Sequence, residues 1–369
     1  MDGVKIYHND YCAACYFRTV AQYPEKKCLI QLTERCNLHC AHCFVSAGNS
    51  GSDISFERLE GDILPQLKKN HVTKVTLTGG EPFVYSRLAD VVSLLSCQGI
   101  SVCICTNASL ITEAFLDEIE GCQVHFNVSM DGFSAASHGR FRGNVSLELF
   151  ERIKENVRLL GKRGLLNGIL VTPNAFAAIS EYVDICKFAK KCGAKYVLMN
   201  PLSQFGRGED GISIAFSEDQ MRKLQVETEK YNDDELEIVY IRFPNRERKP
   251  LGECVAGKIT YIFTNGDIAY CPYMVFASKN AMSKYTDSQF LIGNIFEEGF
   301  EWDRAVRNYR FPICDDEICA GCQNDICKKG CYAAKIASGK TLAEADIELC
   351  PLGWARTGEE PMSGRRKIE

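Results

Sequence analysis

The chain has 369 residues, 46% of them hydrophobic and 25% charged, which is enough for a full-sized core and a second, smaller module. The net charge of -5 argues against a nucleic-acid partner, because such partners require a basic domain or stripe. No apolar run approaches the ~18 residues that span a bilayer, and the first thirty residues lack the apolar stretch of a signal peptide, so we predict a cytoplasmic protein with no membrane partner.

Short β-type runs alternate with helical patterns from about residue 28 to residue 243, after an N-terminal segment of residues 1–27. The predicted strands are residues 28–33, 74–78, 101–106, 124–130, 166–172, 195–200 and 236–243. The predicted helices are near residues 55–70, 86–98, 111–120, 146–162, 178–192 and 217–232. This alternation predicts an α/β fold with a parallel sheet, arranged as a partial (β/α)6 barrel.

Several of these strands alternate instead of reading as continuous apolar runs. In residues 124–130, His125, Asn127 and Ser129 share one face of the strand. Strands covered by helices on both faces are normally apolar throughout, so a polar inner face indicates an open lumen that holds a ligand. A sheet face exposed to solvent is the alternative.

The helical pattern stops after residue 243. Residues 244–253 are rich in charge and are interpreted as a linker, and residues 356–369 as a tail. Between them, residues 254–355 are dense in cysteine, glycine and turns, which is typical of a module organised around metals. The chain has 20 cysteines, and a reducing compartment disfavours disulfides, so soft-metal ligation explains those in short spacings.

A loop with three cysteines follows the first predicted strand. Cys36, Cys40 and Cys43 are separated by three and then two residues. Three thiolates can bind three irons of a cubane cluster and leave the fourth iron open. A zinc site is the alternative, but structural zinc usually has four ligands, and His39 and His42 lie inside the loop.

This C-x3-C-x2-C loop resembles the signature of the radical S-adenosylmethionine (SAM) superfamily. The resemblance implies a catalytic 4Fe-4S cluster on the three cysteines, with SAM bound to the open iron and cleaved by an electron to a 5′-deoxyadenosyl radical. It also implies a reductant such as flavodoxin or ferredoxin, and it places Phe44 near the adenine of SAM.

Further motifs resemble the same superfamily and imply the remaining SAM contacts. Gly79-Gly80-Glu81-Pro82 ends the second strand, where backbone carbonyls and the glutamate would receive the SAM amino group. The others lie at or after strand ends, and they are Asn107, the pair Ser129 and Asp131, and Arg142. In the family pattern, the serine contacts the SAM ribose and the arginine its carboxylate.

The C-terminal cysteines resemble the SPASM extension, whose members carry auxiliary iron–sulfur clusters. The resemblance implies one or two auxiliary 4Fe-4S clusters. The ligands of the distal cluster would be Cys319, Cys322, Cys327 and Cys350, and those of the nearer cluster would be Cys254, Cys271 and Cys331. One spacing is a residue shorter than the family pattern.

The nearer cluster lacks a fourth cysteine between Cys254 and Cys271. It therefore has an open iron, or it is completed by Cys314 or by a ligand other than cysteine. The alternative for the whole region is a structural module resembling a zinc ribbon.

The remaining cysteines have no complete site. Cys12 and Cys15 form a C-x2-C pair that we interpret as ordinary packing rather than a redox pair or metal site. Cys103 and Cys105 share one face of the third strand. If that face lines the lumen, Cys105 could return a hydrogen atom to a substrate radical, although a structural role for a buried thiol is the commoner outcome.

These motifs lead to three hypotheses. The first is oxidative modification of a peptide or protein, such as a crosslink. The second is a small-molecule epimerase or dehydrogenase acting on a sugar or aminoglycoside, and the third is an iron–sulfur scaffold or electron carrier. About 35 residues precede the cysteine loop, too few for the leader-binding domain of many peptide-modifying relatives, so a peptide substrate would need a separate leader-binding protein or the barrel mouth.

Overall fold

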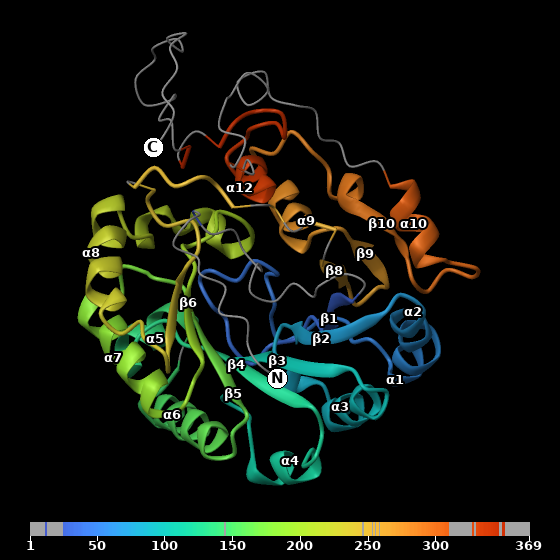
Figure 1. The fold of residues 1–369 in the computed structure, drawn as a ribbon, viewed down its shortest axis with the longest axis horizontal. Helices are drawn as coiled ribbons and strands as arrows, with labels where there is room; N and C mark the ends of the chain where they lie inside the picture. Colours follow the sequence, from blue (N-terminus) through green and yellow to red (C-terminus); the bar gives the residue numbers. More distant parts are fainter. Residues whose placement is uncertain are drawn as a thin grey trace.

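The computed structural model describes residues 12, 25–143, 145–245, 247–252, 254, 256–257, 259–309, 327, 330–346 and 349–350. The described strands form one sheet of ten, in the order β10-β9-β8-β1-β2-β3-β4-β5-β6-β7. Figure 1 shows the strands β1 to β6 following a curve, with α3, α6 and α7 on its outer side.

The first seven strands are parallel neighbours in chain order, as a βα repeat requires. They are β1 (Lys26–Thr33), β2 (Val72–Gly79), β3 (Ser101–Thr106), β4 (Val124–Ser129), β5 (Leu166–Val171), β6 (Tyr196–Met199) and β7 (Glu237–Tyr240). All seven predicted strands are present, and the predicted α/β fold with a parallel sheet is confirmed.

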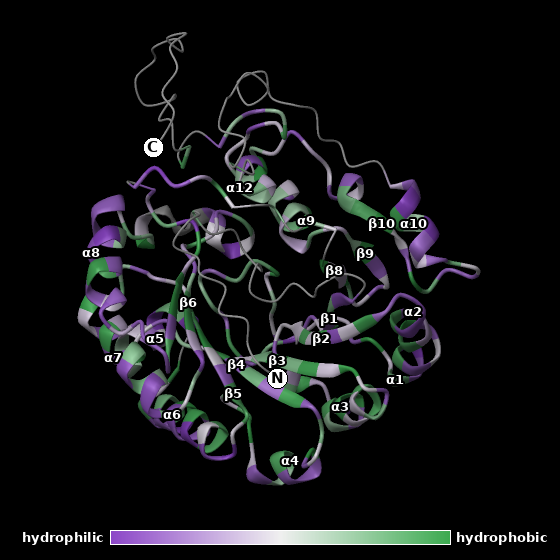
Figure 2. Ribbon diagram, in the orientation of Figure 1, coloured by the Kyte–Doolittle hydropathy of each residue, from purple (hydrophilic) through white to green (hydrophobic). Residues whose placement is uncertain are grey.

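The helices between these strands include one or more at each predicted position, and η4, α5 and η5 in addition. They are α1 (Phe56–Arg58), η3 (Leu59–Ile63), α2 (Leu64–Lys69), η4 (Pro82–Val84), α3 (Leu88–Cys97), α4 (Glu113–Glu118), α5 (Ala135–Arg142), α6 (Leu147–Lys162), α7 (Ile179–Lys191), η5 (Gly206–Ile214) and α8 (Glu218–Glu229). Figure 2 shows purple residues interleaved with green ones along α6, α7 and α8, as expected for helices that cover a sheet and face water.

Helix α6 shows how the sequence specifies an outer helix. The Ser146 hydroxyl caps it by accepting a hydrogen bond from the Leu149 N–H at 3.1 Å. Phe150, Ile153 and Val157 are then buried at helical spacing against the sheet. Each such side chain contributes about 1.5–3 kcal/mol by leaving water.

The helix predicted near residues 55–70 is divided into three pieces. A π-helical turn, η3, separates α1 from α2. Pro65 lies in the first turn of α2 and has no N–H, so the α-helical hydrogen-bond ladder cannot pass through it. A wider turn before the proline avoids that missing bond.

Helix α5 was not predicted, because its sequence shows almost no apolar periodicity. It is specified by its cap: the Ser134 hydroxyl accepts a hydrogen bond from the Ser137 N–H at 3.2 Å. The helix ends at Arg142, so it delivers a predicted site residue to the sheet opening.

The strands after residue 254 were not predicted either. They are β8 (Ile259–Ile262), β9 (Asp267–Ala269) and β10 (Leu291–Asn294), accompanied by α9 (Pro272–Ser278), η6 (Asp287–Phe290), α10 (Trp302–Asn308) and α12 (Tyr332–Ala337). β8 pairs in parallel with β1, so the C-terminal part continues the barrel sheet. The predicted domain boundaries stay a prediction.

The main core lies between the sheet and the outer helices. It includes Ile104, Phe126, Val128 and Ile169, all with no exposed surface. Alternate residues of the same strands line a cavity, among them Asn127 and Ser129 of β4 as predicted, whereas His125 is not in its lining. In the part of the chain that the structure describes, no helix is both long and apolar enough to cross a membrane.

Candidate functional site

A cavity of about 260 Å³ lies inside the curved sheet. The loop after β1 lines it with Cys36, Cys40 and Cys43, and further predicted site residues come from this loop, from the ends of β2 to β4 and from the end of α5, whereas the predicted Pro82 and Asp131 are not in the lining. Those that line it are Phe44, Gly79, Gly80, Glu81, Cys105, Asn107, Ser129 and Arg142. The parallel topology brings them together, because the carboxyl ends of parallel strands meet at one edge.

Backbone hydrogen bonds within the cysteine loop and the side chain of Arg207 hold this loop in place. The Cys36 N–H donates to the Gly48 carbonyl at 2.6 Å, and the Cys43 N–H donates to the Cys40 carbonyl at 3.3 Å. Arg207 of η5 donates from Nε to the Cys40 carbonyl at 2.8 Å and from Nη1 to the Ala47 carbonyl at 2.7 Å. Arg207 was not predicted, because an arginine 167 positions away in the chain carries no sequence signal for this contact.

The two glycines after β2 let the strand end approach the cysteine loop. A Cβ on Gly80 would lie 2.1 Å from the Arg35 carbonyl oxygen, and a Cβ on Gly79 would lie 2.3 Å from that of Thr33. The Gly80 N–H donates to the Thr33 carbonyl at 2.8 Å, and the Glu81 N–H donates to that of Arg35 at 2.9 Å. The glycines are therefore needed for packing against the chain itself, in addition to any approach to SAM.

Glu81 is 1% exposed and its carboxylate already accepts three hydrogen bonds. The donors are the Thr106 hydroxyl at 2.6 Å, the Asn107 N–H at 2.8 Å and the Phe83 N–H at 3.2 Å. An ionised carboxylate has about four acceptor positions, so about one remains for an ammonium. Burial raises the pKa of Glu81, and these hydrogen bonds oppose that rise.

Asn107 joins the turn after β3 to the cysteine loop. Its Nδ2 donates to Oδ1 of Asn37 at 3.0 Å, and Nδ2 of Asn37 donates to the Ser109 hydroxyl at 2.8 Å. The Asn107 Oδ1 accepts from the Ser109 N–H at 2.9 Å. Asn107 therefore orders the rim of the cavity, and its predicted contact with SAM stays a prediction.

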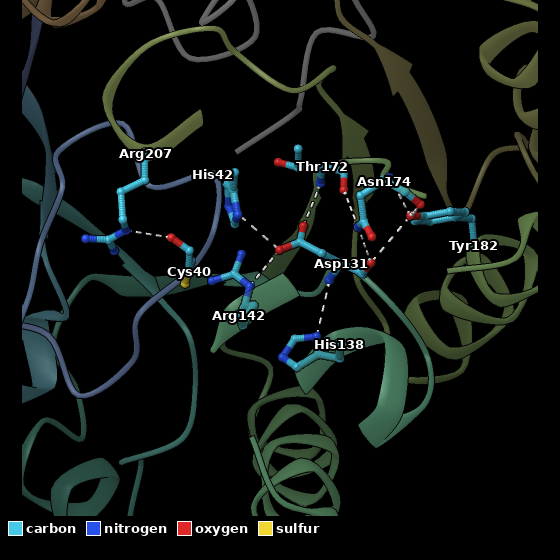
Figure 3. A network of polar contacts seen from close by, with 9 residues as sticks. All are labelled: Cys40, His42, Asp131, His138, Arg142, Thr172, Asn174, Tyr182 and Arg207. Carbon is cyan, nitrogen blue, oxygen red and sulfur yellow. Dashed lines mark hydrogen bonds and ion pairs between the residues drawn. The ribbon is translucent and has the colours of Figure 1, made fainter. Parts of the chain in front are cut away.

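Asp131 is the centre of a buried polar network that Figure 3 shows from close by. It lies at the end of β4 with no exposed surface. Arg142 Nε donates to Asp131 Oδ2 at 2.6 Å, and the Thr172 N–H donates to Oδ1 at 2.6 Å. Its carbonyl accepts from Asn174 Nδ2 at 2.9 Å, and His138 Nδ1 accepts from its N–H at 3.3 Å.

The network reaches the cysteine loop through Arg142 and His42. His42 stacks on Phe141 at 4.3 Å between ring centroids, and its Nε2 lies 3.8 Å from Asp131 Oδ2. Burial lowers the pKa of His42 to about 4, with Asp131 opposing the change, so the ring is neutral at physiological pH. Burial raises the pKa of Cys40 to about 12, and the nearby Arg142 guanidinium lowers it.

Phe44 belongs to an aromatic cluster that joins the loop to the C-terminal part. Its ring centroid lies 5.3 Å from that of Tyr273 and 5.2 Å from that of Phe276, both on α9, and 6.4 Å from that of Phe205. Tyr273 also lines the cavity. It was not predicted as a site residue, although it stands two positions after Cys271.

Three of the predicted auxiliary ligands lie near one another. Cys271 precedes α9 and Cys331 precedes α12, and these two helices pack together. Burial raises the pKa of Cys271, and the charges of Cys254 and Cys331 raise it further, which places the three thiols within electrostatic reach. The Cys327 sulfur accepts a weak hydrogen bond from the Leu251 N–H at 3.4 Å.

Some predicted residues cannot be placed. Cys319, Cys322, Cys314 and Cys15 lie outside the described residues. Cys350 is described and half-buried. Cys12, interpreted as ordinary packing, contacts the Phe243 carbonyl through its sulfur at 3.8 Å, and burial raises its pKa to about 11.

The residues around the cavity fit an iron–sulfur cluster and SAM. Thiolate sulfur is the usual ligand of such clusters. Among the described residues, no three His, Cys, Asp or Glu side chains are grouped to hold a single metal ion, whereas a cubane presents separate irons to its thiolates. Two buried polar atoms of cavity-lining residues, His42 Nδ1 and Thr76 Oγ1, have no hydrogen-bond partner in the described structure. Such atoms are expected where a polar ligand binds.

Comparisons with known proteins show which family and fold the chain resembles. Residues 30–193 match the model of the Radical SAM superfamily. Mycofactocin maturase MftC of Mycolicibacterium smegmatis is 26% identical over 340 residues, which cover 88% of this chain and 82% of that protein. The antilisterial bacteriocin subtilosin biosynthesis protein AlbA of Bacillus subtilis is 27% identical over 322 residues, which cover 84% of this chain and 68% of that protein.

A solved structure of similar fold is Streptococcus suis SuiB bound to the precursor peptide SuiA. It is 18% identical, with a TM-score of 0.68, and the match covers 88% of this chain and 76% of that one. The mixed α/β fold, the cysteine loop after β1 and the family match lead to one conclusion: the chain contains a radical SAM superfamily domain over residues 30–193.

Proposed function

We propose that the chain is a radical SAM enzyme that oxidatively modifies a peptide or protein, for instance by forming a crosslink. One observation carries the proposal. The thiols of Cys36, Cys40 and Cys43 line the same cavity as the three strand ends that resemble SAM-binding elements. When bound, the cluster and SAM supply reductive cleavage of a sulfonium to a carbon radical that removes a hydrogen atom from the substrate.

The residues of the chain have separate tasks in this proposal. Cys36, Cys40 and Cys43 hold the cluster, and Glu81 offers its remaining acceptor position to the SAM ammonium. Arg142 faces the cavity and is held by the buried Asp131 carboxylate, so it can meet the SAM carboxylate without moving.

The names of the relatives favour a peptide substrate. MftC is named a maturase, and AlbA is named a protein of bacteriocin biosynthesis. A reductant such as flavodoxin or ferredoxin would supply the electron, and a separate leader-binding protein could present the peptide.

The C-terminal cysteines are proposed to hold one or two auxiliary 4Fe-4S clusters, as in a SPASM extension. The proximity of Cys254, Cys271 and Cys331 supports a shared cluster on these three thiols. An auxiliary cluster can accept the electron left on a product radical, which a two-electron oxidation requires. Iron quantification of the reconstituted protein tests this, because a count near four irons per chain would leave only the catalytic cluster.

Cleavage of SAM is the direct test of the main proposal. The reduced, cluster-replete protein should release 5′-deoxyadenosine, and replacing Cys36, Cys40 and Cys43 together with alanine should abolish that release. The matched control replaces three cysteines remote from the cavity, Cys97, Cys186 and Cys192, with alanine, and it should keep the parent rate. Equal release by the cavity variant and the parent would refute the proposal.

Epimerisation is the second candidate, favoured by the position of Cys105. Its thiol lines the cavity, where it could return a hydrogen atom to a substrate radical. Mass spectrometry separates the two reactions, because a crosslink removes two hydrogens and epimerisation in heavy water adds one deuterium. Cys105→Ala should abolish deuterium incorporation if the thiol is the donor, and it should leave crosslinking intact.

A further inference from the structure

The floor of the cavity is formed by four polar side chains on four different strands. They are Lys27 on β1, Thr76 on β2, Asn127 on β4 and Tyr196 on β6, and all line the cavity. Lys27 and Tyr196 stand at the amino ends of their strands, opposite the cysteine loop, which follows the carboxyl end of β1. The superfamily motifs include none of these four residues.

Lys27 is a buried lysine for which the described structure supplies no acid. The residue is 7% exposed and makes no hydrogen bond or ion pair within the described residues. Burial lowers its pKa, and the charge of Lys74 adds to the effect, whereas Cys103 and Cys105 raise it. Burying an ammonium is unfavourable unless an opposite charge compensates it, so this arrangement indicates an anionic ligand.

The carboxylate in the cavity lining already has hydrogen-bond partners of its own. Glu81 is the only carboxylate among the residues that line the described cavity, and its oxygens accept hydrogen bonds from Thr106, Asn107 and Phe83. The other cation in the lining, Arg142, is paired with Asp131. Of the two basic residues in the described lining, Lys27 is therefore the one without an acidic partner.

Thr76 adds a second group that points to a ligand. It is 4% exposed, and its hydroxyl has no partner in the described structure. The hydroxyl can donate one hydrogen bond, which an anion would accept. Asn127 and Tyr196 are held in place, because the Tyr196 hydroxyl donates to Asn127 Oδ1 at 2.8 Å and Asn167 Nδ2 donates to the same oxygen at 3.0 Å.

We propose that this floor is a carboxylate-binding subsite, in which the Lys27 ammonium and the Thr76 hydroxyl receive a carboxylate of the substrate. The inference deepens the proposed function and rests on it for the identity of the substrate as a peptide. A peptide has two sources of this group, its C-terminal carboxylate and an acidic side chain. Held at the floor, the carboxylate would orient the substrate toward the cysteine loop.

Binding of small probes tests the subsite without any turnover. The cluster-reconstituted protein with SAM is titrated with two pairs of probes. The first pair is N-acetylalanine and N-acetylalanine amide, and the second is N-acetylaspartic acid α-amide and N-acetylasparagine amide. The first pair represents a C-terminus and the second a side chain. By saturation-transfer NMR, at least one acid should bind about tenfold more tightly than its amide, which corresponds to about 1.4 kcal/mol.

Matched variants assign the preference to Lys27. Lys27→Met should abolish it and Lys27→Arg should keep it, while Thr76→Val should weaken acid binding about threefold to tenfold. Lys74→Met is the control, because Lys74 pairs in register with Lys27 but is exposed. Unchanged SAM affinity of each variant shows that it folds.

Two results would overturn the subsite. One is equal binding of acids and amides by the parent. The other is an acid preference that survives in Lys27→Met. The binding titration does not measure SAM cleavage. A failure of the proposed function would therefore be seen in the separate cleavage assay, as absent 5′-deoxyadenosine with the acid preference intact.

Discussion

Replacing Asp131 with asparagine removes the charge of a fully buried carboxylate and keeps its size. The change leaves the Arg142 guanidinium, itself nine-tenths buried, without an opposite charge. Removing one partner of a buried ion pair costs about 3–5 kcal/mol. We therefore expect Asp131→Asn to lower the free energy of unfolding by about that amount.

Urea unfolding measures this loss as a shift of the midpoint at an unchanged slope. The matched control is Asp303→Asn, because Asp303 pairs with Lys26 at 3.3 Å with both side chains 37% exposed. A surface pair contributes at most about 1 kcal/mol. If the two variants shift the midpoint equally, the buried ion pair stabilises the fold no more than the exposed one does, and the reasoning fails.

The pH dependence gives a second check on Asp131. Burial raises its pKa, but the Arg142 guanidinium and neighbouring groups outweigh burial, so the pKa lies below its usual value. A group with a depressed native pKa stabilises the fold above its unfolded pKa, and this stabilisation is lost as the pH falls through the native pKa. The difference between wild type and Asp131→Asn should therefore be constant from neutral pH to about pH 5 and narrow below about pH 4.

Three further changes test other parts of the site. Gly143→Ala should reduce the iron bound per chain, because at φ +80° a Cβ would lie 2.4 Å from a carbonyl oxygen of the cysteine loop. The control is Gly164→Ala, at φ +70° with open space around it, which should keep full iron loading. Lys27→Met should raise the free energy of unfolding by about 1–3 kcal/mol at neutral pH, since it removes a buried lysine without an acidic partner. This gain in stability should shrink as the pH rises toward about 10, the pKa of lysine in the unfolded chain. A lower urea midpoint for Lys27→Met than for the parent would contradict this prediction. Thr106→Val should cost about 1.5–3 kcal/mol in urea unfolding by removing a hydrogen bond to the buried Glu81 carboxylate, and no loss would show that the bond is replaceable.

The sequence alone was sufficient for the seven parallel strands β1 to β7 and for the cysteine loop. A parallel βα repeat has one favoured handedness and places consecutive strands side by side, so the seven strands and the meeting of their carboxyl ends follow from local patterns. The alternation in β4, with Asn127 and Ser129 on one face, also predicted which side chains line the lumen, because the side-chain period of a strand is two.

Elements without local periodicity could not be predicted. Helix α5 depends on a serine cap and on packing of Gly143 against the cysteine loop, and β8 depends on pairing with β1 more than two hundred residues away. Neither contact leaves a pattern along the chain, because the partners are distant in sequence.

The electrostatic state of the site was decided by the tertiary structure. Sequence motifs named Glu81 and Asp131, but the internal donors that occupy their oxygens come from other strands and loops. The predicted first strand begins at residue 28 and leaves Lys27 in the N-terminal segment, whereas the structure places Lys27 in β1, where its lack of a partner emerges as the sheet closes around it. Spacing determines which residues can share a face, whereas burial and the charges brought near by folding determine which of them are left to bind a ligand.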